Sequence, residues 1–324
     1  MAKILIIKLG ALGDVVMATA LIRQIQQYHA HDDLWLLTAP AYLEIFAEWP
    51  GLNTVAFSRK GLRENLKAIA WTRNSGFARV YDLQSSDRSA VLCALSGIPE
   101  RVGNHPYFPY NIHPADKYTG QCHIFERMLE VLRSAGIAPV GLPPEIPLAE
   151  NEKSFVVSWL EKNELLSVPF VILHPGASHQ HPEKHWPHFL EFALALRDSG
   201  LAVVWAGAES EREMNRQYSG QVGIDASNIF SINMLAELGR YARFAVTNDS
   251  GPMHVLSCSG IPVYAFFGPT SWRRNHALGQ KTNVLAFELM HPGNDAGQND
   301  LTNLALITVS DVIGRLRKDG HLPA

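Results

Sequence analysis

The segment KILIIKLGALGDVVMATALIRQIQQ (3–27) indicates how the chain begins to fold. Its apolar run at 4–7 fits a buried strand, and Gly10 follows it closely. After Asp14, apolar residues recur at steps of three and four, which predicts an amphipathic helix. A strand, a glycine-containing turn and a helix are the opening unit of a Rossmann-like domain.

The same alternation continues through both halves of the chain. Short β-rich runs predict strands at 4–8, 34–38, 54–57, 79–83, 101–103, 170–174, 202–207, 244–248 and 263–268. Helical patterns separate most of them, and the tail 306–318 predicts a closing helix that begins near Ser310 or Asp311. This order implies parallel sheets that are covered by helices.

A proline-rich stretch without periodicity, GIAPVGLPPEIPLAENEK (136–153), is expected to be a linker. We therefore expect an α/β protein with two Rossmann-like domains, 1–150 and 151–324, facing each other across a cleft. The length of 324 residues fits two domains of about 150 residues each. In such folds, substrates bind at the carboxyl ends of the strands.

Composition narrows the class of protein. The formal net charge is −3 and the charged residues are spread along the chain, so we expect no nucleic-acid partner. The three cysteines make no metal-binding spacing and suggest a reducing compartment. No apolar run approaches the ~20 residues that span a bilayer. Lys8 and Asp14 interrupt the apolar N-terminus, which argues against an export signal and for a cytoplasmic protein.

The turn before Asp14 departs from the dinucleotide-binding fingerprint. Leu12 replaces one glycine of G-x-G-x-x-G, and no acidic residue ends the second predicted strand. A carboxylate at the positive end of a helix dipole would also repel a pyrophosphate. Asp14 is therefore either the N-cap of the helix or a general base that faces the cleft.

The second half carries the features expected of an anion site. In TNDSGPMH (247–254), the backbone N–H groups near Ser250 and Gly251 can bind a diphosphate, although an ordinary helix start would look similar. In HPGASHQHPEKHWP (174–187), Lys184 can neutralise phosphate and Ser178 can hydrogen-bond to it, unless both are merely solvated. Glu209, at the next strand-to-helix turn, either complements the helix dipole or accepts hydrogen bonds from sugar hydroxyls.

Histidines cluster around this loop, at positions 174, 179, 181, 185 and 188. Pro182 prevents one helix from holding His181 and His185 in its interior, and no cysteine or ordered carboxylate pattern completes a site. We expect no metal.

A basic stripe is predicted in the first half. Arg59, Arg63 and Lys67 are each four apart and would share one helix face, with Lys60 beside them. The opposite face would hold the apolar residues Leu62, Leu66 and Ile69. The stripe is either a solvated surface or a contact for an anionic acceptor or anionic lipid. Arg88 would begin the helix after the fourth strand, near the cleft.

Five segments together resemble the ADP-heptose:lipopolysaccharide heptosyltransferases, glycosyltransferase family nine. They are IIKLGALGDVVMATALIRQI (6–25), YDLQSSDRSA (81–90), LHPGASHQHPEKHWP (173–187), WAGAESER (205–212) and TNDSGPMHVLSCSGIPVYAFFGPT (247–270). The resemblance implies the GT-B fold, with the acceptor on the first domain and the nucleotide-sugar on the second. It implies that Asp14 is the catalytic base. The implied donor site includes Lys184, Glu209, Asp249, Ser250, Gly251 and His254, and we expect Ser178 and Met234 to belong to it as well. We expect the acceptor to contact Gly13, Arg59, Arg63 and Arg88.

The resemblance further implies transfer of a heptose from ADP-heptose, with inversion, to a Kdo or heptose hydroxyl of the lipopolysaccharide inner core. It implies no cofactor, and a cytoplasmic location with a peripheral contact on the inner membrane. Two loops depart from the family pattern, DLQSSDRS for DLQGLLRS and GPTSWRR for GxTDPxR, so the acceptor and the exact sugar stay open. The alternatives are a related transferase with another nucleotide-sugar or a non-core acceptor, a non-catalytic nucleotide-sugar-binding protein, and an oxidoreductase, which the broken fingerprint disfavours.

Overall fold

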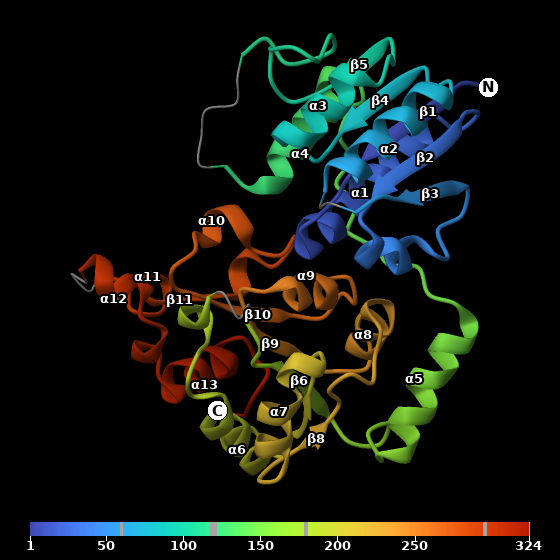
Figure 1. The fold of residues 1–324 in the computed structure, drawn as a ribbon. Helices are drawn as coiled ribbons and strands as arrows, with labels where there is room; N and C mark the ends of the chain where they lie inside the picture. Colours follow the sequence, from blue (N-terminus) through green and yellow to red (C-terminus); the bar gives the residue numbers. More distant parts are fainter. Residues whose placement is uncertain (59–60, 117–121, 178–180, 294–296, 324) are drawn as a thin grey trace. The chain divides into compact units, whose positions relative to one another are not determined.

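The computed structural model describes the whole chain except residues 59–60, 117–121, 178–180, 294–296 and 324. The chain divides into two compact units, Met1–Pro147 and Leu148–Ala324, close to the expected boundary after residue 150. Each unit contains one parallel β-sheet (Figure 1). No helix in the described residues is long and apolar enough to cross a membrane.

The first unit has a five-stranded sheet with the order β3-β2-β1-β4-β5. All its strand pairs are parallel, and Ile4 of β1 lies in register with Leu34 of β2 and Arg79 of β4. The strand order reverses direction between β1 and β4, which makes that position the topological switch point. The elements are β1 (Lys3–Ile7), α1 (Leu12–Tyr28), β2 (Asp33–Thr38), η1 (Pro40–Phe46), β3 (Leu52–Ala56), α2 (Leu62–Asn74), β4 (Arg79–Asp82), α3 (Asp87–Leu95), β5 (Glu100–Val102) and α4 (Ile124–Ser134).

The second unit has a six-stranded parallel sheet with the order β11-β10-β9-β6-β7-β8, so its switch point lies between β6 and β9. Its strands are β6 (Phe170–His174), β7 (Ala202–Trp205), β8 (Ile224–Asp225), β9 (Ala245–Asn248), β10 (Val263–Phe267) and β11 (Val284–Ala286). Its helices are α5 (Glu150–Lys162), η2 (Pro182–Lys184), α6 (Phe189–Asp198), η3 (Glu209–Glu211), α7 (Arg212–Ser219), α8 (Ile232–Gly239), α9 (Gly251–Ser257), α10 (Trp272–Asn275), η4 (Lys281–Asn283), α11 (Phe287–Met290), α12 (Gln298–Thr302), η5 (Leu304–Leu306) and α13 (Val309–Lys318).

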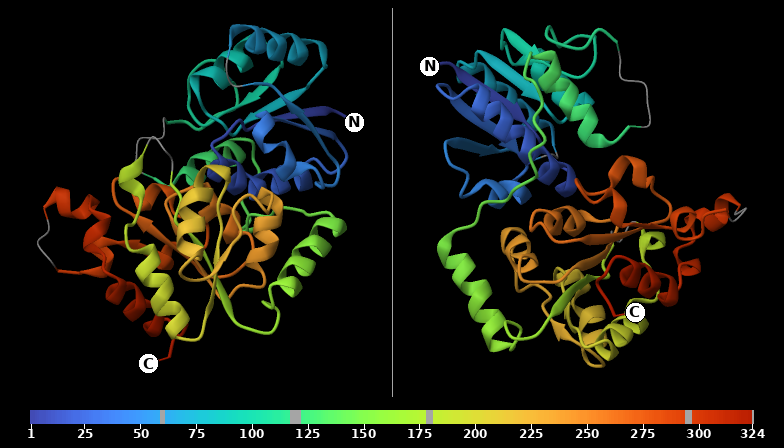
Figure 2. Two further views of the ribbon diagram at one scale, coloured as in Figure 1. Left: turned by 60° about the horizontal axis from the view of Figure 1, so that its bottom comes forward. Right: turned by 180° about the vertical axis from the view of Figure 1, so that it is seen from behind.

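Helices cover both faces of the second sheet (Figure 2), and its central strands are correspondingly apolar. All five residues of β6 are buried. Val171 and Leu173 pack into the core on one face, and Phe170 and Ile172 pack into the core on the other. Because side chains alternate along a strand, a strand buried on both sides must be a continuous apolar run. This is why the strand was predictable.

One prediction about local structure was wrong, and one helix has an unexpected exposed face. The linker was expected to extend to residue 153, but α5 begins at Glu150, where the carboxylate of Glu152 accepts a hydrogen bond from the N–H of Ala149. Acidic residues in a first turn favour helix formation. In α2, Leu62 and Leu66 are 74% and 56% exposed, and the buried residues are Ala68 and Thr72.

Candidate active site

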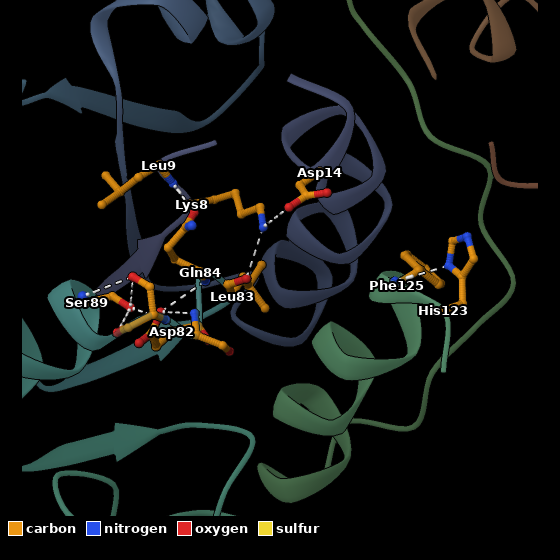
Figure 3. Close-up of polar contacts among 11 residues, drawn as sticks. Lys8, Leu9, Asp14, Asp82, Leu83, Gln84, Ser89, His123 and Phe125 are labelled. Carbon is orange, nitrogen blue, oxygen red and sulfur yellow. Dashed lines mark hydrogen bonds and ion pairs between the residues drawn. The ribbon is translucent and has the colours of Figure 1, made fainter. Parts of the chain in front are cut away.

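Asp14 is the third residue of α1, and it is not the N-cap. The helix begins at Leu12, its N-cap is Ala11, and no side chain caps it, so the capping interpretation is wrong. The Asp14 side chain is 27% exposed, and its Oδ2 atom lies 3.6 Å from the Nζ atom of Lys8 (Figure 3). Gly13, the residue before it, is buried in the same turn. The carboxylate is therefore held at the first turn and is accessible from outside.

The loops that follow β1 and β4 are bonded to each other at the switch point. The N–H of Leu9 donates to the Oε1 atom of Gln84 at 2.8 Å, and the ammonium of Lys8 donates to the carbonyl of Leu83 at 3.3 Å. Burial lowers the pKa of Lys8, against the opposing attraction of Asp14 and Asp82. The two loops thus form one rigid edge that carries Asp14.

Asp82, at the end of β4, is fully buried beneath this edge. Its carboxylate accepts hydrogen bonds from the backbone N–H groups of Gln84 and Ser85 at 3.0 and 2.9 Å, and from the hydroxyl of Tyr110 at 2.5 Å. Burial raises the pKa of Asp82, and it also raises the pKa of Tyr110. Asp82 therefore stabilises the loop and has no free edge for a ligand.

Arg88 lies in the first turn of α3 and is half-buried. It lines a pocket of about 240 Å³ whose other walls are mostly apolar, including Leu9, Phe57 and Val91. Within the described residues, its guanidinium has no hydrogen-bond or ion-pair partner. An unpaired guanidinium in a pocket is suited to a carboxylate or a phosphate.

The structure describes two residues of the predicted basic stripe, Arg63 and Lys67. Arg63 lies on α2 and is exposed, and Lys67 on the same helix forms a 2.6 Å ion pair with Glu64. Arg59 and Lys60 lie outside the described residues. Arg63 and Lys67 both lie on α2, four residues apart, as the sequence predicted.

In the second unit, Lys184 and Asp249 connect the two loops at the switch point. Lys184 ends η2 after β6, and Asp249 follows β9. The Nζ atom of Lys184 lies 2.8 Å from the Oδ2 atom of Asp249, with side chains 17% and 10% exposed. The hydroxyl of Thr270, from the loop after β10, donates to the same oxygen at 2.5 Å. Sequence reasoning missed Thr270, which lies in the divergent GPTSWRR segment.

Asn248 anchors the loop that carries Lys184. It is fully buried; its Oδ1 atom accepts from the N–H of Trp186 at 3.0 Å, and its Nδ2 atom donates to the carbonyl of Pro175 at 2.6 Å. Trp186 is itself buried, with its ring stacked on Phe266 at a centroid distance of 4.2 Å. A polar residue that ends an apolar strand, directly before Asp249, was the feature of the sequence that could have indicated this role of Asn248.

Most of the remaining donor-site candidates lie at or in α9, and Met234 lies in α8. Ser250 is the N-cap residue of α9 and Gly251 is the first residue of that helix, both half-buried beside Asp249. His254 is buried in the same helix, and Met234 is half-buried in α8 against the core. Ser178 lies outside the described residues.

Glu209 is exposed in the loop after β7, the neighbour of β6. Its carboxylate accepts from Arg212 at 3.0 and 3.1 Å and from the amide of Asn228 at 3.0 Å. In the part of the chain that the structure describes, no hydrogen bond or ion pair joins Glu209 to Lys184 or Asp249.

The histidines of the loop after β6 do not share one site, because two of them contact different partners. His181 contacts Glu183 at 3.0 Å, and the Nε2 atom of His188 lies 3.2 Å from the carbonyl of Ala305. His179 falls outside the described residues. Among the residues that are described, no group of three or more His, Cys, Asp and Glu side chains is arranged to hold a metal ion.

Solved structures share the fold. The glycosyl transferase family 9 structure from Veillonella parvula has a TM-score of 0.85 at 20% identity, covering 98% of this chain and 96% of its own. The Escherichia coli ADP-heptose lipopolysaccharide heptosyltransferase II has a TM-score of 0.76 at 24% identity, covering 98% of each chain. The predicted fold class, the GT-B fold of two Rossmann-like domains, is confirmed.

The sequence comparisons define the family. The model of glycosyltransferase family 9 (heptosyltransferase) matches residues 67–301. Lipopolysaccharide heptosyltransferase 2 of Escherichia coli K12 is 26% identical over 309 residues, which cover 87% of each chain. The lipopolysaccharide core heptosyltransferase OpsX of Haemophilus influenzae is 20% identical, covering 97% of this chain and 96% of its own.

The chain belongs to glycosyltransferase family 9, the heptosyltransferase family. The resemblance that the sequence indicated is confirmed, and so is the assignment to the glycosyltransferases rather than to the oxidoreductases.

Proposed function

We propose that the chain transfers a heptose from ADP-heptose to a hydroxyl group of a lipopolysaccharide inner-core acceptor. The observation that carries this proposal is the contrast between the two switch points. One presents a half-exposed carboxylate, Asp14, and the other presents an ammonium, Lys184, beside a helix start. The names of the relatives support it, and the structure of Escherichia coli heptosyltransferase WaaC, which has a TM-score of 0.72 to this chain, holds ADP.

The second unit would bind the donor. An ammonium has three N–H donors, and the contact with Asp249 uses one of them, so Lys184 can also reach phosphate oxygens. The turn at Ser250 and Gly251 lies directly after Asp249 and would support the diphosphate. We further propose Ser178, Glu209, Met234 and His254 as donor-binding residues. Positive groups around the diphosphate would stabilise the charge that grows on ADP as it leaves, so no metal is required.

The first unit would bind the acceptor. The unpaired guanidinium of Arg88 would bind a carboxylate or phosphate of the core sugars. We propose Gly13, Arg59 and Arg63 as further acceptor contacts. Exposed cations such as Arg63 contribute about 1 kcal/mol each near an anionic bilayer, enough only for a weak peripheral contact on the cytoplasmic side of the inner membrane.

The proposed step is a displacement with inversion. The acceptor oxygen attacks the anomeric carbon while Asp14 takes the hydroxyl proton, and the bond from that carbon to the diphosphate breaks on the opposite face. ADP leaves with the electron pair. General-base assistance of this kind contributes about 100- to 10,000-fold to the rate.

The substitution Asp14→Asn tests the proposal. We expect turnover to fall at least ~100-fold, since the amide cannot take the proton, while ADP affinity stays within about twofold. ADP release in the presence of ADP-heptose and a core acceptor measures turnover, and calorimetry measures ADP binding. Glu126→Gln is the matched control, because Glu126 is also a first-turn acid of a helix in the first unit.

Near-normal turnover of Asp14→Asn would refute the role as base. If none of the core acceptors caused the unmodified chain to release ADP, a panel of other nucleotide-sugars and acceptors would identify a related transferase. Binding of ADP-heptose without turnover under any condition would indicate the non-catalytic alternative.

A further inference from the structure

Lys8 places a buried ammonium group next to the carboxylate of Asp14. The Lys8 side chain is only 2% exposed, and its Nζ atom lies 3.6 Å from Asp14 and 3.3 Å from the carbonyl of Leu83 (Figure 3). Moving an ammonium out of water is unfavourable unless hydrogen bonds or an opposite charge compensate for it. The position of this ammonium therefore depends on those two partners.

The other nearby carboxylate cannot replace Asp14 as the partner. Asp82 lies close enough to attract Lys8, but hydrogen bonds from two backbone N–H groups and from Tyr110 already occupy its oxygens. Among the described residues, Asp14 is the only carboxylate within ion-pair distance of Lys8. The ammonium is thus directed at the carboxylate that the proposed reaction uses.

Backbone N–H groups also hold these loops together, besides the bond from the ammonium to Leu83. The backbone N–H of Lys8 already donates to the carbonyl of Leu37 at 3.0 Å, and the N–H of Leu9 donates to Gln84 at 2.8 Å. These bonds fix the turn to β2 and to the loop after β4 without the charged group. The ammonium therefore adds a buried charge beside Asp14 to loops that backbone N–H groups already join, which points to a role in the chemistry.

We propose that Lys8 is a positioning residue, which holds the Oδ2 atom of Asp14 so that Oδ1 is presented to the hydroxyl group of the acceptor. The inference rests on the proposed role of Asp14 as the base. Lys8 is too buried to contact the substrate, so its effect passes through Asp14 alone. A free carboxylate would rotate among several orientations, and most of these would not accept the proton.

A double-mutant cycle tests this inference. Lys8→Met keeps the length of the side chain and removes its charge, and it is combined with Asp14→Asn. We expect Lys8→Met alone to lower kcat at least tenfold with ADP affinity within twofold. In the Asp14→Asn background, the same change should lower the residual turnover less than twofold, because the positioned carboxylate is already gone. Lys3→Met is the control, since Lys3 is an exposed lysine at the start of β1, the strand that Lys8 directly follows.

The outcomes separate this inference from the proposed function. An equal fold loss in both backgrounds, or an unchanged kcat in Lys8→Met, would overturn the role of Lys8 even if Asp14→Asn is inactive. A fully active Asp14→Asn would instead overturn the base. If Lys8→Met does not fold, Lys8→Gln keeps an N–H donor for the carbonyl of Leu83. Wild-type kcat in a folded Lys8→Gln protein would overturn the inference, and a tenfold loss of kcat in it would support it.

Discussion

Replacing Lys184 with alanine should weaken ADP binding about 150-fold. The first part of this loss comes from the missing ammonium. The Lys184 side chain is only 17% exposed, and its Nζ atom is held 2.8 Å from Asp249, so little ordering is left to occur when a phosphate binds. A hydrogen bond to a charged group contributes about 2 kcal/mol. That corresponds to roughly 30-fold in the dissociation constant.

The second part comes from Asp249. Without Lys184, the carboxylate would keep only the hydroxyl of Thr270 as a partner among the described residues, and it would face the diphosphate of the proposed donor site as a bare negative charge. Two like charges about 4 Å apart repel by ~1 kcal/mol even in water. That is a further factor of about five. Adding Asp249→Asn to Lys184→Ala should therefore restore roughly fivefold of the lost affinity.

Calorimetric titration with ADP measures the ADP affinity of the unmodified protein, of Lys184→Ala and of the double variant. A thermal unfolding curve confirms that each is folded. The matched control is Lys153→Ala, which removes an exposed lysine of α5 that pairs with Glu150. We expect its ADP affinity to be unchanged. Wild-type affinity in Lys184→Ala would place the nucleotide elsewhere in the molecule. A double variant weaker than Lys184→Ala would show that Asp249 contacts the ligand directly, and would refute the repulsion.

Two further predictions concern the acceptor and the effect of pH. Arg88→Ala should raise the Michaelis constant for a short, soluble core acceptor about tenfold, as for one lost charged hydrogen bond, and leave ADP affinity unchanged; an unchanged constant would refute the acceptor site. Burial lowers the pKa of His174 below its usual 6.5, so the unfolded chain binds the proton more readily and stability should fall as the pH drops below about 6.5. Urea unfolding at pH 7.5 and 5.5 measures how much free energy of unfolding is lost on acidification, and we expect this loss to be smaller in His174→Asn than in the unmodified protein. Some loss should remain, because burial also lowers the pKa of His185 and His276. Equal losses in the two proteins would contradict the role of His174.

The sheets were predictable because buried parallel strands consist of consecutive apolar residues, which are visible in the sequence. Every strand expected from the sequence is present, as β1 to β7, β9 and β10, apart from shifts of a few residues at the ends. The two strands that were not predicted, β8 and β11, have two and three residues and lie at the edges of the second sheet. Such short segments carry too little periodicity to be distinguished from loops.

Helix starts and helix faces were harder to predict, because both depend on tertiary contacts. Moving the start of α1 from Asp14 to Leu12 changes Asp14 from a cap to a first-turn residue, whose partly exposed carboxylate pairs with Lys8. The face of α2 that packs on the sheet includes Ala68 and Thr72, so the larger Leu62 and Leu66 remain exposed. A helical pattern fixes which residues share a face, but only the neighbouring elements decide which face is buried.

The partners of the site residues could not be predicted from local patterns, because they come from distant segments. The bond from Lys184 to Asp249 joins residues 65 apart, and the bond from Lys8 to Leu83 joins residues 75 apart. A general physical expectation was nevertheless available. A lysine that directly follows a buried parallel strand must find an acceptor, because its ammonium cannot be buried alone. The nearest acceptors lie in the loops that meet at the same edge of the sheet, on either side of the switch point. Lys8 satisfies this expectation with Asp14 and Leu83, so its charge could have indicated a partner for Asp14 from the sequence alone.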